Sequence, residues 1–241
     1  MLCAIMQPTF LPWMGYFSMM SKVDLFVYFD DVQLAKRSWQ VRNRIKTQNG
    51  ELFLNIPIKK SAARDELLLC DAIMDESQGW RQKHLSSIYH SYKKTPFFEN
   101  VYPFLENIYG EKTDKLSEFT ILLIESIKAA INIETKTALS SSLEGIEGQK
   151  DERLASICKA VGASSYFSAA ASKEYIELES PGGAFAKNGI ELAYQEYIHP
   201  QYTQLGADFL PYMCIADLLF NVGFENALDV INNNTKDKAT C

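Results

Sequence analysis

Two short apolar runs near the N-terminus, joined by a proline-containing loop and a helix-length segment, constrain the fold of this chain more than any other feature. Leu2–Met6 predicts a buried strand, and the aromatic and branched residues at 24–29 predict a second one. A helix is expected between them, from about Trp13 to Lys22. Such a crossover places its two strands in parallel. We therefore expect an α/β fold.

Later segments continue the alternation of strands and helices. Residues 41–46 and 51–58 predict a hairpin, because Asn49-Gly50 is a strong turn signal. Pro103 is expected to break the chain. Further strands are expected at 67–73, 165–168 and 190–195, and further helices at 114–131, from Asp151 to just before Gly162, and at 213–221.

The expected architecture is a mostly parallel sheet with flanking helices. Its N-terminal unit is Rossmann-like, with the general layout of the nucleotidyltransferases, and a helical portion follows. We expect residues 1–231 to form a single α/β domain, with a helical subregion at 78–160 and a linker-like serine-rich stretch at 140–148. Residues 232–241 are expected to form a flexible polar tail.

Composition and charge exclude several classes of protein. A formal net charge of −6 argues against general nucleic-acid binding. No run approaches the ~20 apolar residues of a membrane span, so no membrane insertion is expected. The start of the chain lacks the pattern of a secretory signal, so we expect a cytoplasmic location. The five cysteines are isolated, which predicts buried free thiols at Cys3, Cys70, Cys158 and Cys214 and no metal site.

The basic residues gather near the N-terminus. Residues 1–60 carry 8 Lys and Arg against 4 Asp and Glu, whereas the rest of the chain carries 16 against 26. The segment "AKRSWQVRNRIK" at 35–46 has no acidic residue. Guanidinium groups bind phosphate, and tryptophan stacks on rings, so the segment suits a nucleotide-linked substrate. The alternative is a strand with solvated basic side chains. The predicted substrate-binding residues here are Lys36, Arg37, Trp39, Arg42, Asn43 and Arg44.

Other candidates follow the expected strands, where parallel sheets hold their ligands. Gln7 is a candidate for hydrogen bonding and Tyr16 for ring contact. Asp30 and Asp31 are candidate catalytic residues, as a base and its orienting group, or else they form structural ion pairs. His84 is a third catalytic candidate, with a packing role as the alternative.

One carboxylate has no obvious partner. Asp217 interrupts an apolar helix in "MCIADLLFN" and must therefore be paired or hydrogen-bonded. An N-terminal arginine, a backbone group or a helix end are the partners considered.

Several stretches together resemble the WbqC-like protein family. They are "IMQPTFLPWMGYF", "DLFVYFDDVQLAKRSWQVRNRI", "NIPIKK", "GWRQKHLSSIYHSYKKTPFF" and "ADLLFNVG", which span the chain to about Gly223. The resemblance implies a bacterial cytoplasmic protein encoded among genes for surface polysaccharide such as O-antigen. It supplies no established catalytic residue to carry over.

That context suggests transfer of an acyl or aminoacyl group to the amine of a nucleotide-linked amino sugar. An acyl or aminoacyl thioester would be the donor, and a carrier protein would be a partner besides the nucleotide-linked sugar. One alternative is a non-catalytic binding or assembly protein of the same pathway. Another is a nucleotide-handling enzyme of nucleotidyltransferase-like architecture, although Trp13 and Tyr16 stand where that architecture carries its phosphate-binding histidines.

Overall fold

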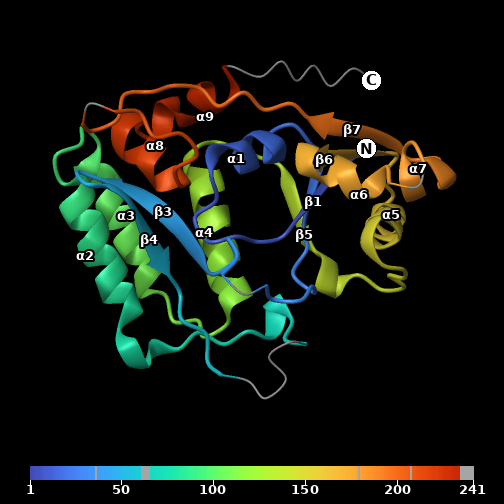
Figure 1. Ribbon diagram of the computed structural model, residues 1–241, viewed down its shortest axis with the longest axis horizontal. Helices are drawn as coiled ribbons and strands as arrows, with labels where there is room; N and C mark the ends of the chain where they lie inside the picture. Colours follow the sequence, from blue (N-terminus) through green and yellow to red (C-terminus); the bar gives the residue numbers. More distant parts are fainter. Residues whose placement is uncertain (36, 61–65, 179, 207, 234–241) are drawn as a thin grey trace.

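The computed structural model describes residues 1–35, 37–60, 66–178, 180–206 and 208–233 (Figure 1). Its central element is a five-stranded parallel sheet of strand order β5-β2-β1-β6-β7. Helices flank this sheet, which confirms the predicted α/β class. The strands are β1 (Leu2–Met6), β2 (Leu25–Tyr28), β5 (Lys136–Leu139), β6 (Ser165–Ala169) and β7 (Glu191–Gln195).

The first crossover folds as predicted. Helix α1 (Met14–Met20) connects β1 to β2, and every residue of this helix is buried. The chain moves from β1 to one side of the sheet and later returns to β6, on the other side of β1. In a doubly wound sheet this reversal opens a crevice beyond the carboxyl ends of the two strands. The loop after β1 therefore lies where ligands bind in such folds.

Alternate residues of β1 face two hydrophobic layers, as the period of a strand requires. Ala4 belongs to the core that contains α1, while Cys3 and Ile5 face the layer of the short C-terminal helices. Figure 1 shows α5 and α7 at one end of the molecule and α2 and α3 at the other. The second layer consists of α5 (Lys150–Ala160), α6 (Lys173–Ile176) and α7 (Gly183–Lys187).

The larger core includes five further helices. They are α2 (Trp80–Tyr92), α3 (Phe98–Gly110), α4 (Leu116–Ala130), α8 (Ile215–Val222) and α9 (Phe224–Asn232). Pro103 lies inside α3, so the predicted chain break there was wrong. The missing N–H of Pro103 leaves the carbonyl of Glu99 without its helical partner. Both residues are exposed, so water can satisfy that carbonyl.

The predicted hairpin is confirmed as a separate antiparallel pair, β3 (Arg42–Thr47) and β4 (Gly50–Asn55). The strand predicted at 67–73 was wrong. That segment contains a single 3₁₀ turn, Leu69–Asp71. The N–H groups of Leu69 and Cys70 donate to the carbonyls of Val32 and Asp30, so the segment pairs with a loop instead of a strand.

Two predictions concern the membrane and the tail. Within the ranges given above, no helix is both long and apolar enough to cross a membrane. Most of the predicted tail, residues 234–241, lies outside the described residues.

Candidate functional site

A cavity of about 380 Å³ opens beside the carboxyl end of β1. We call it the aromatic pocket. It lies where the fold predicts a ligand, and its volume is in the range of small-molecule sites. Its lining residues are Met6, Thr9, Pro12, Trp13, Tyr16, Trp39, Asn43, Arg44 and Tyr212.

Asn43 joins the hairpin to the loop after β1. Its side-chain amide is buried and donates to the carbonyls of Phe10 at 3.0 Å and Leu11 at 2.7 Å. The N–H of Phe10 in turn donates to the carbonyl of Trp39 at 2.9 Å. The two Asn43 bonds satisfy carbonyls of the irregular loop that follows β1. They also fix β3 over the pocket.

Trp13 forms one wall and depends on a glycine. A Cβ atom on Gly15 would lie only 2.2 Å from the Trp13 ring, so the ring occupies space that only glycine leaves open. The ring packs edge-on against Tyr212, with centroids 5.5 Å apart, and parallel to His199 at 6.3 Å. Tyr212 and His199 therefore both restrict the movement of the Trp13 ring.

Tyr16 forms the floor of the aromatic pocket. Its hydroxyl donates to the carbonyl of Gln7 at 3.3 Å, and burial raises the pKa of this phenol well above its ordinary value. The phenol therefore stays neutral. Gln7 does not line the pocket, and its side-chain oxygen accepts from the amide of Gln40 at 2.8 Å.

Arg44 is the charged group of the pocket. Among the described residues that line it, Arg44 alone is ionisable apart from the two tyrosines. Its Nη1 lies 2.8 Å and 2.9 Å from the two carboxylate oxygens of Glu51, and Nε and Nη2 lie 3.4 Å from the carbonyl of Tyr212. The guanidinium carbon is 5.9 Å from the centre of the Trp39 ring. A cation therefore lies beside an exposed aromatic ring at the pocket wall.

The other predicted basic residues do not line this pocket. Arg42 stacks its guanidinium over Phe53 at 4.9 Å. Arg37 lines a separate cavity of about 210 Å³. Lys36 lies outside the described residues. The structure thus brings together Tyr16, Trp39, Asn43 and Arg44 from the predicted set.

Asp30 and Asp31 connect the end of β2 to the turn after β5. The carboxylate of Asp30 accepts from both the N–H and hydroxyl of Ser141, at 3.0 Å and 2.7 Å, and from the hydroxyl of Ser140 at 3.1 Å. Asp31 accepts from the Ser140 hydroxyl and pairs with the guanidinium of Arg153. Both carboxylates thus bind neighbouring parts of the fold, and neither lines the aromatic pocket.

His84 is enclosed by α2, β4 and α3. Its Nε2 lies 3.0 Å from the carbonyl of Asn55 and its Nδ1 3.3 Å from the hydroxyl of Tyr109. Burial lowers the pKa of this imidazole to about 4. The ring is therefore neutral at pH 7, and it also does not line the pocket.

Five lining residues were not predicted as binding residues: Met6, Thr9, Pro12, Trp13 and Tyr212. Tyr212 lies 168 positions from Arg44, the residue that its carbonyl contacts. No local motif marks Tyr212, because only the tertiary fold brings it to the pocket.

Comparison with known proteins places this site in a family. The model of the WbqC-like protein family matches residues 7–229, which include eight of the nine lining residues. The chain belongs to the WbqC-like protein family. A relative from Mycobacterium tuberculosis H37Rv is 32% identical over 224 residues, which cover 92% of this chain and 94% of the relative. That relative is described as an uncharacterized protein, and no solved structure matches this WbqC-like chain.

The WbqC-like pocket combines three chemical features. Aromatic rings offer flat apolar surfaces, Arg44 offers a delocalised positive charge, and Asn43 fixes the backbone between them. This combination suits a ligand that carries both a ring and an anionic group.

Proposed function

We propose that this WbqC-like chain binds a nucleotide-linked amino sugar in the aromatic pocket and transfers an acyl or aminoacyl group to the amine of that sugar. The pathway would be bacterial surface-polysaccharide biosynthesis of the O-antigen type, in the cytoplasm. The observation that carries the proposal is that Arg44 lies beside Trp39 at the carboxyl edge of the parallel sheet, where the strand order reverses. A diphosphate next to a base or sugar ring complements this pair.

The proposed contacts have ordinary magnitudes. Stacking of a base on an aromatic side chain is worth about 1–3 kcal/mol. A charge-assisted hydrogen bond to phosphate contributes about 1.5–3 kcal/mol. Together they contribute about 2.5–6 kcal/mol, so further contacts in the pocket must supply the rest of the roughly 8 kcal/mol that a micromolar Kd requires. Glu51 must share or release the guanidinium when the phosphate binds.

The transfer step needs positioning more than acid-base chemistry. The neutral amine nitrogen attacks the thioester carbonyl, a C–N bond forms, the C–S bond breaks, and the amine proton leaves to the departing thiolate or to water. Apolar surroundings lower the pKa of an amine and so favour its nucleophilic form. Holding the amine and the thioester together supplies the remaining acceleration. In this proposal Asp30, Asp31 and His84 act on the fold and not on the substrate.

Calorimetry with UDP- and dTDP-linked amino sugars tests the binding half. We expect Arg44→Met to weaken binding at least about tenfold, since the variant loses a charge-assisted contact. Arg37→Met is the matched control, because Arg37 belongs to another cavity and should leave the affinity unchanged. Equal affinity of Arg44→Met and the native protein would overturn the site assignment.

Mass spectrometry tests the transfer half. The protein is incubated with the bound sugar nucleotide and a panel of acyl and aminoacyl thioesters, and an acylated sugar is the expected product. The second candidate function is non-catalytic binding in the same pathway. The engagement of Asp30, Asp31 and His84 in structural bonds favours it. Tight sugar-nucleotide binding without any acylated product would select that alternative.

A further inference from the structure

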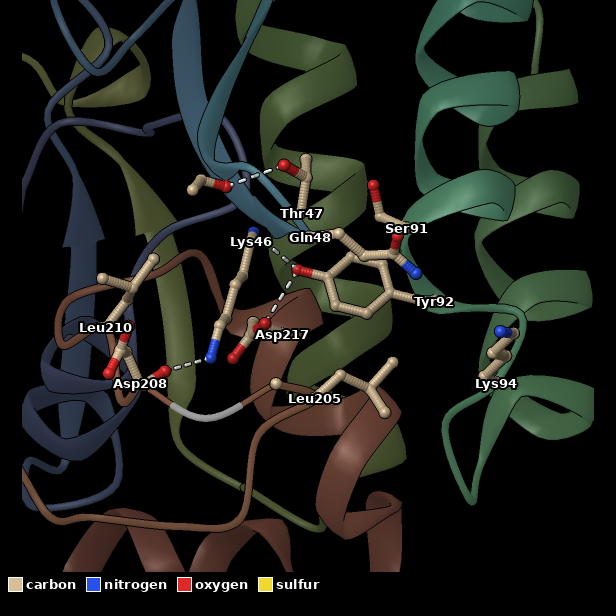
Figure 2. Close-up of a pocket in the computed structure, with 12 residues that line it drawn as sticks. Lys46, Thr47, Gln48, Ser91, Tyr92, Lys94, Leu205, Asp208, Leu210 and Asp217 are labelled. Atoms are coloured by element: carbon tan, nitrogen blue, oxygen red, sulfur yellow. Dashed lines mark hydrogen bonds between the residues drawn. The ribbon is translucent and has the colours of Figure 1, made fainter.

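A second cavity, of about 400 Å³, lies beside the C-terminal end of β3 (Figure 2). We call it the lysine pocket. Lys46 on β3, Tyr92 on α2 and Asp217 on α8 converge there, and the segment before α8 covers them. Leu205 and Leu210 supply apolar surface, and Lys94 adds an exposed cation at the rim. None of the residues predicted from sequence to bind substrate lines this pocket.

Lys46 is nearly buried, with 7% of the residue exposed. Its ammonium donates to the side-chain oxygen of Gln204 at 3.2 Å and to the carbonyl of Asp208. Both acceptors are uncharged, and no described carboxylate forms an ion pair with Lys46. An ammonium carries three N–H donors, so one remains for a further acceptor. A buried cation with a free donor next to a cavity is a binding position for an anion.

Asp217 holds the lysine pocket together through hydrogen bonds, and its carboxylate does not neutralise the ammonium of Lys46 by direct contact. Its Oδ1 accepts from the hydroxyl of Tyr92 at 2.9 Å, and its Oδ2 accepts from the hydroxyl of Tyr202 and the amide of Gln204, both at 2.7 Å. The N–H of Lys46 donates to the Tyr92 hydroxyl at 3.0 Å. The lysine is therefore fixed through its backbone and through Gln204. Tyr92, Tyr202 and Gln204 use most of the acceptor capacity of the carboxylate.

We propose that the lysine pocket is a second ligand site, which binds the phosphate or carboxylate group of a small molecule through Nζ of Lys46. Tyr92, Leu205 and Leu210 contact the apolar part of that molecule. Lys94 strengthens the attraction for an anion at the entrance. The hydrogen bonds that Asp217 accepts from Tyr92, Tyr202 and Gln204 keep the ammonium of Lys46 oriented toward the cavity.

The two pockets share one strand. Arg44 and Lys46 are two positions apart on β3, which places their Cα atoms about 7 Å from each other on the same face. The segment that approaches this face contributes Leu210 to the lysine pocket and Tyr212 to the aromatic pocket. Two substrates bound in the two pockets would be neighbours. If the proposed function holds, on which this last step rests, the lysine pocket receives the phosphate end of the thioester donor.

An NMR titration with inorganic phosphate and with acetate, against chloride at equal ionic strength, tests the site. We expect saturable shifts at the amides of Gly50, Ser91 and Gly206. Lys46→Met should weaken the binding at least about tenfold, while Lys83→Met, which removes an exposed lysine of α2, should not. A response to phosphate alone identifies a phosphate ligand, and a response to acetate alone identifies a carboxylate ligand. Shifts that stay linear and are the same in Lys46→Met overturn the proposal.

Leu205→Trp gives a second variant that leaves the buried network intact. It fills the cavity from its partly exposed wall, and we expect the same loss of anion binding; retained binding would overturn the site. Coenzyme A then tests the donor assignment. If coenzyme A shifts the amide signals of Ser91 and Gly206 at lower concentrations than phosphate does, the donor assignment is supported. If coenzyme A shifts neither signal, the donor assignment is refuted. A sugar nucleotide that fails to shift Thr9 or the Trp13 indole refutes the proposed function separately.

Discussion

Arg44 and Glu51 form a two-bond pair across the β3–β4 hairpin, with Nη1 of the arginine 2.8 Å and 2.9 Å from the two carboxylate oxygens. Both side chains are partly exposed. A pair of this kind contributes only about 0–1 kcal/mol to stability. The arginine can therefore exchange its partner for a ligand phosphate at little cost.

Replacement of Glu51 by glutamine should strengthen ligand binding. The variant removes a negative charge that competes with the phosphate for Arg44, so we expect a several-fold lower Kd for the sugar nucleotide. The free energy of unfolding should change by less than about 1 kcal/mol. Calorimetry at low and high salt measures the effect, which salt should reduce. A loss of affinity as large as that of Arg44→Met would contradict the prediction.

Gly15→Ala should damage the aromatic pocket more than the fold. The new methyl group would overlap the Trp13 ring, whose atoms lie 2.2–2.6 Å from the ideal Cβ position. The ring must move, and it carries one pocket wall with it. We expect a changed tryptophan fluorescence spectrum and a weaker affinity for the sugar nucleotide. Gly110→Ala is the control, because a Cβ atom there meets nothing within 4 Å.

Asp30→Ala should destabilise the protein without changing ligand affinity. The substitution leaves the N–H and the hydroxyl of Ser141 without their carboxylate acceptor and removes one of the two acceptors of the Ser140 hydroxyl. We expect a loss of about 2–4 kcal/mol in the free energy of unfolding, measured with urea. Asp229→Ala removes an exposed carboxylate of α9 and should cost less than about 0.5 kcal/mol. Loss of product formation in a fully folded Asp30→Ala protein would instead restore a catalytic role.

The buried imidazole of His84 should make stability depend on pH. Its pKa is about 4 in the folded protein, whereas an unfolded histidine titrates near ~6.5. Between these values the unfolded state binds more protons, so stability falls as the pH falls from about 6.5 to 4. The contribution of this one group is about 3 kcal/mol. Urea unfolding at several pH values should show this slope, and His84→Gln should reduce it.

The sequence predicted the elements that depend on local pattern. The crossover at the N-terminus and the hairpin at Asn49-Gly50 follow from periodicity and turn chemistry, and both are confirmed. Strand β5 and helix α9 were missed, since β5 has only four residues and α9 follows directly after Gly223. The strand expected at 67–73 failed because its backbone donors go to the loop that begins at Asp30.

The candidate site was predictable only in its N-terminal half. Tyr16, Trp39, Asn43 and Arg44 stand out as a basic and aromatic cluster within one short stretch of chain. Tyr212 approaches Arg44 through the tertiary fold alone. Likewise, Asp217 required a partner, but its bonds to Tyr92 and Tyr202 follow from the packing of α2 and the segment before α8. No residue pattern along the chain specifies such contacts.

Among the described residues the two hairpin strands pair only with each other and add no strand to the parallel sheet, yet the hairpin carries Arg44 of the aromatic pocket and Lys46 of the lysine pocket. The Cα atoms of Arg44 and Lys46 therefore move together, because one strand of continuous backbone joins them. A small tilt of β3 that improves the contact of one cation with its ligand also alters the contact of the other cation with its own ligand. If both proposed ligands bind, such a tilt couples the two binding events, and linkage then requires each ligand to change the affinity of the other by the same factor.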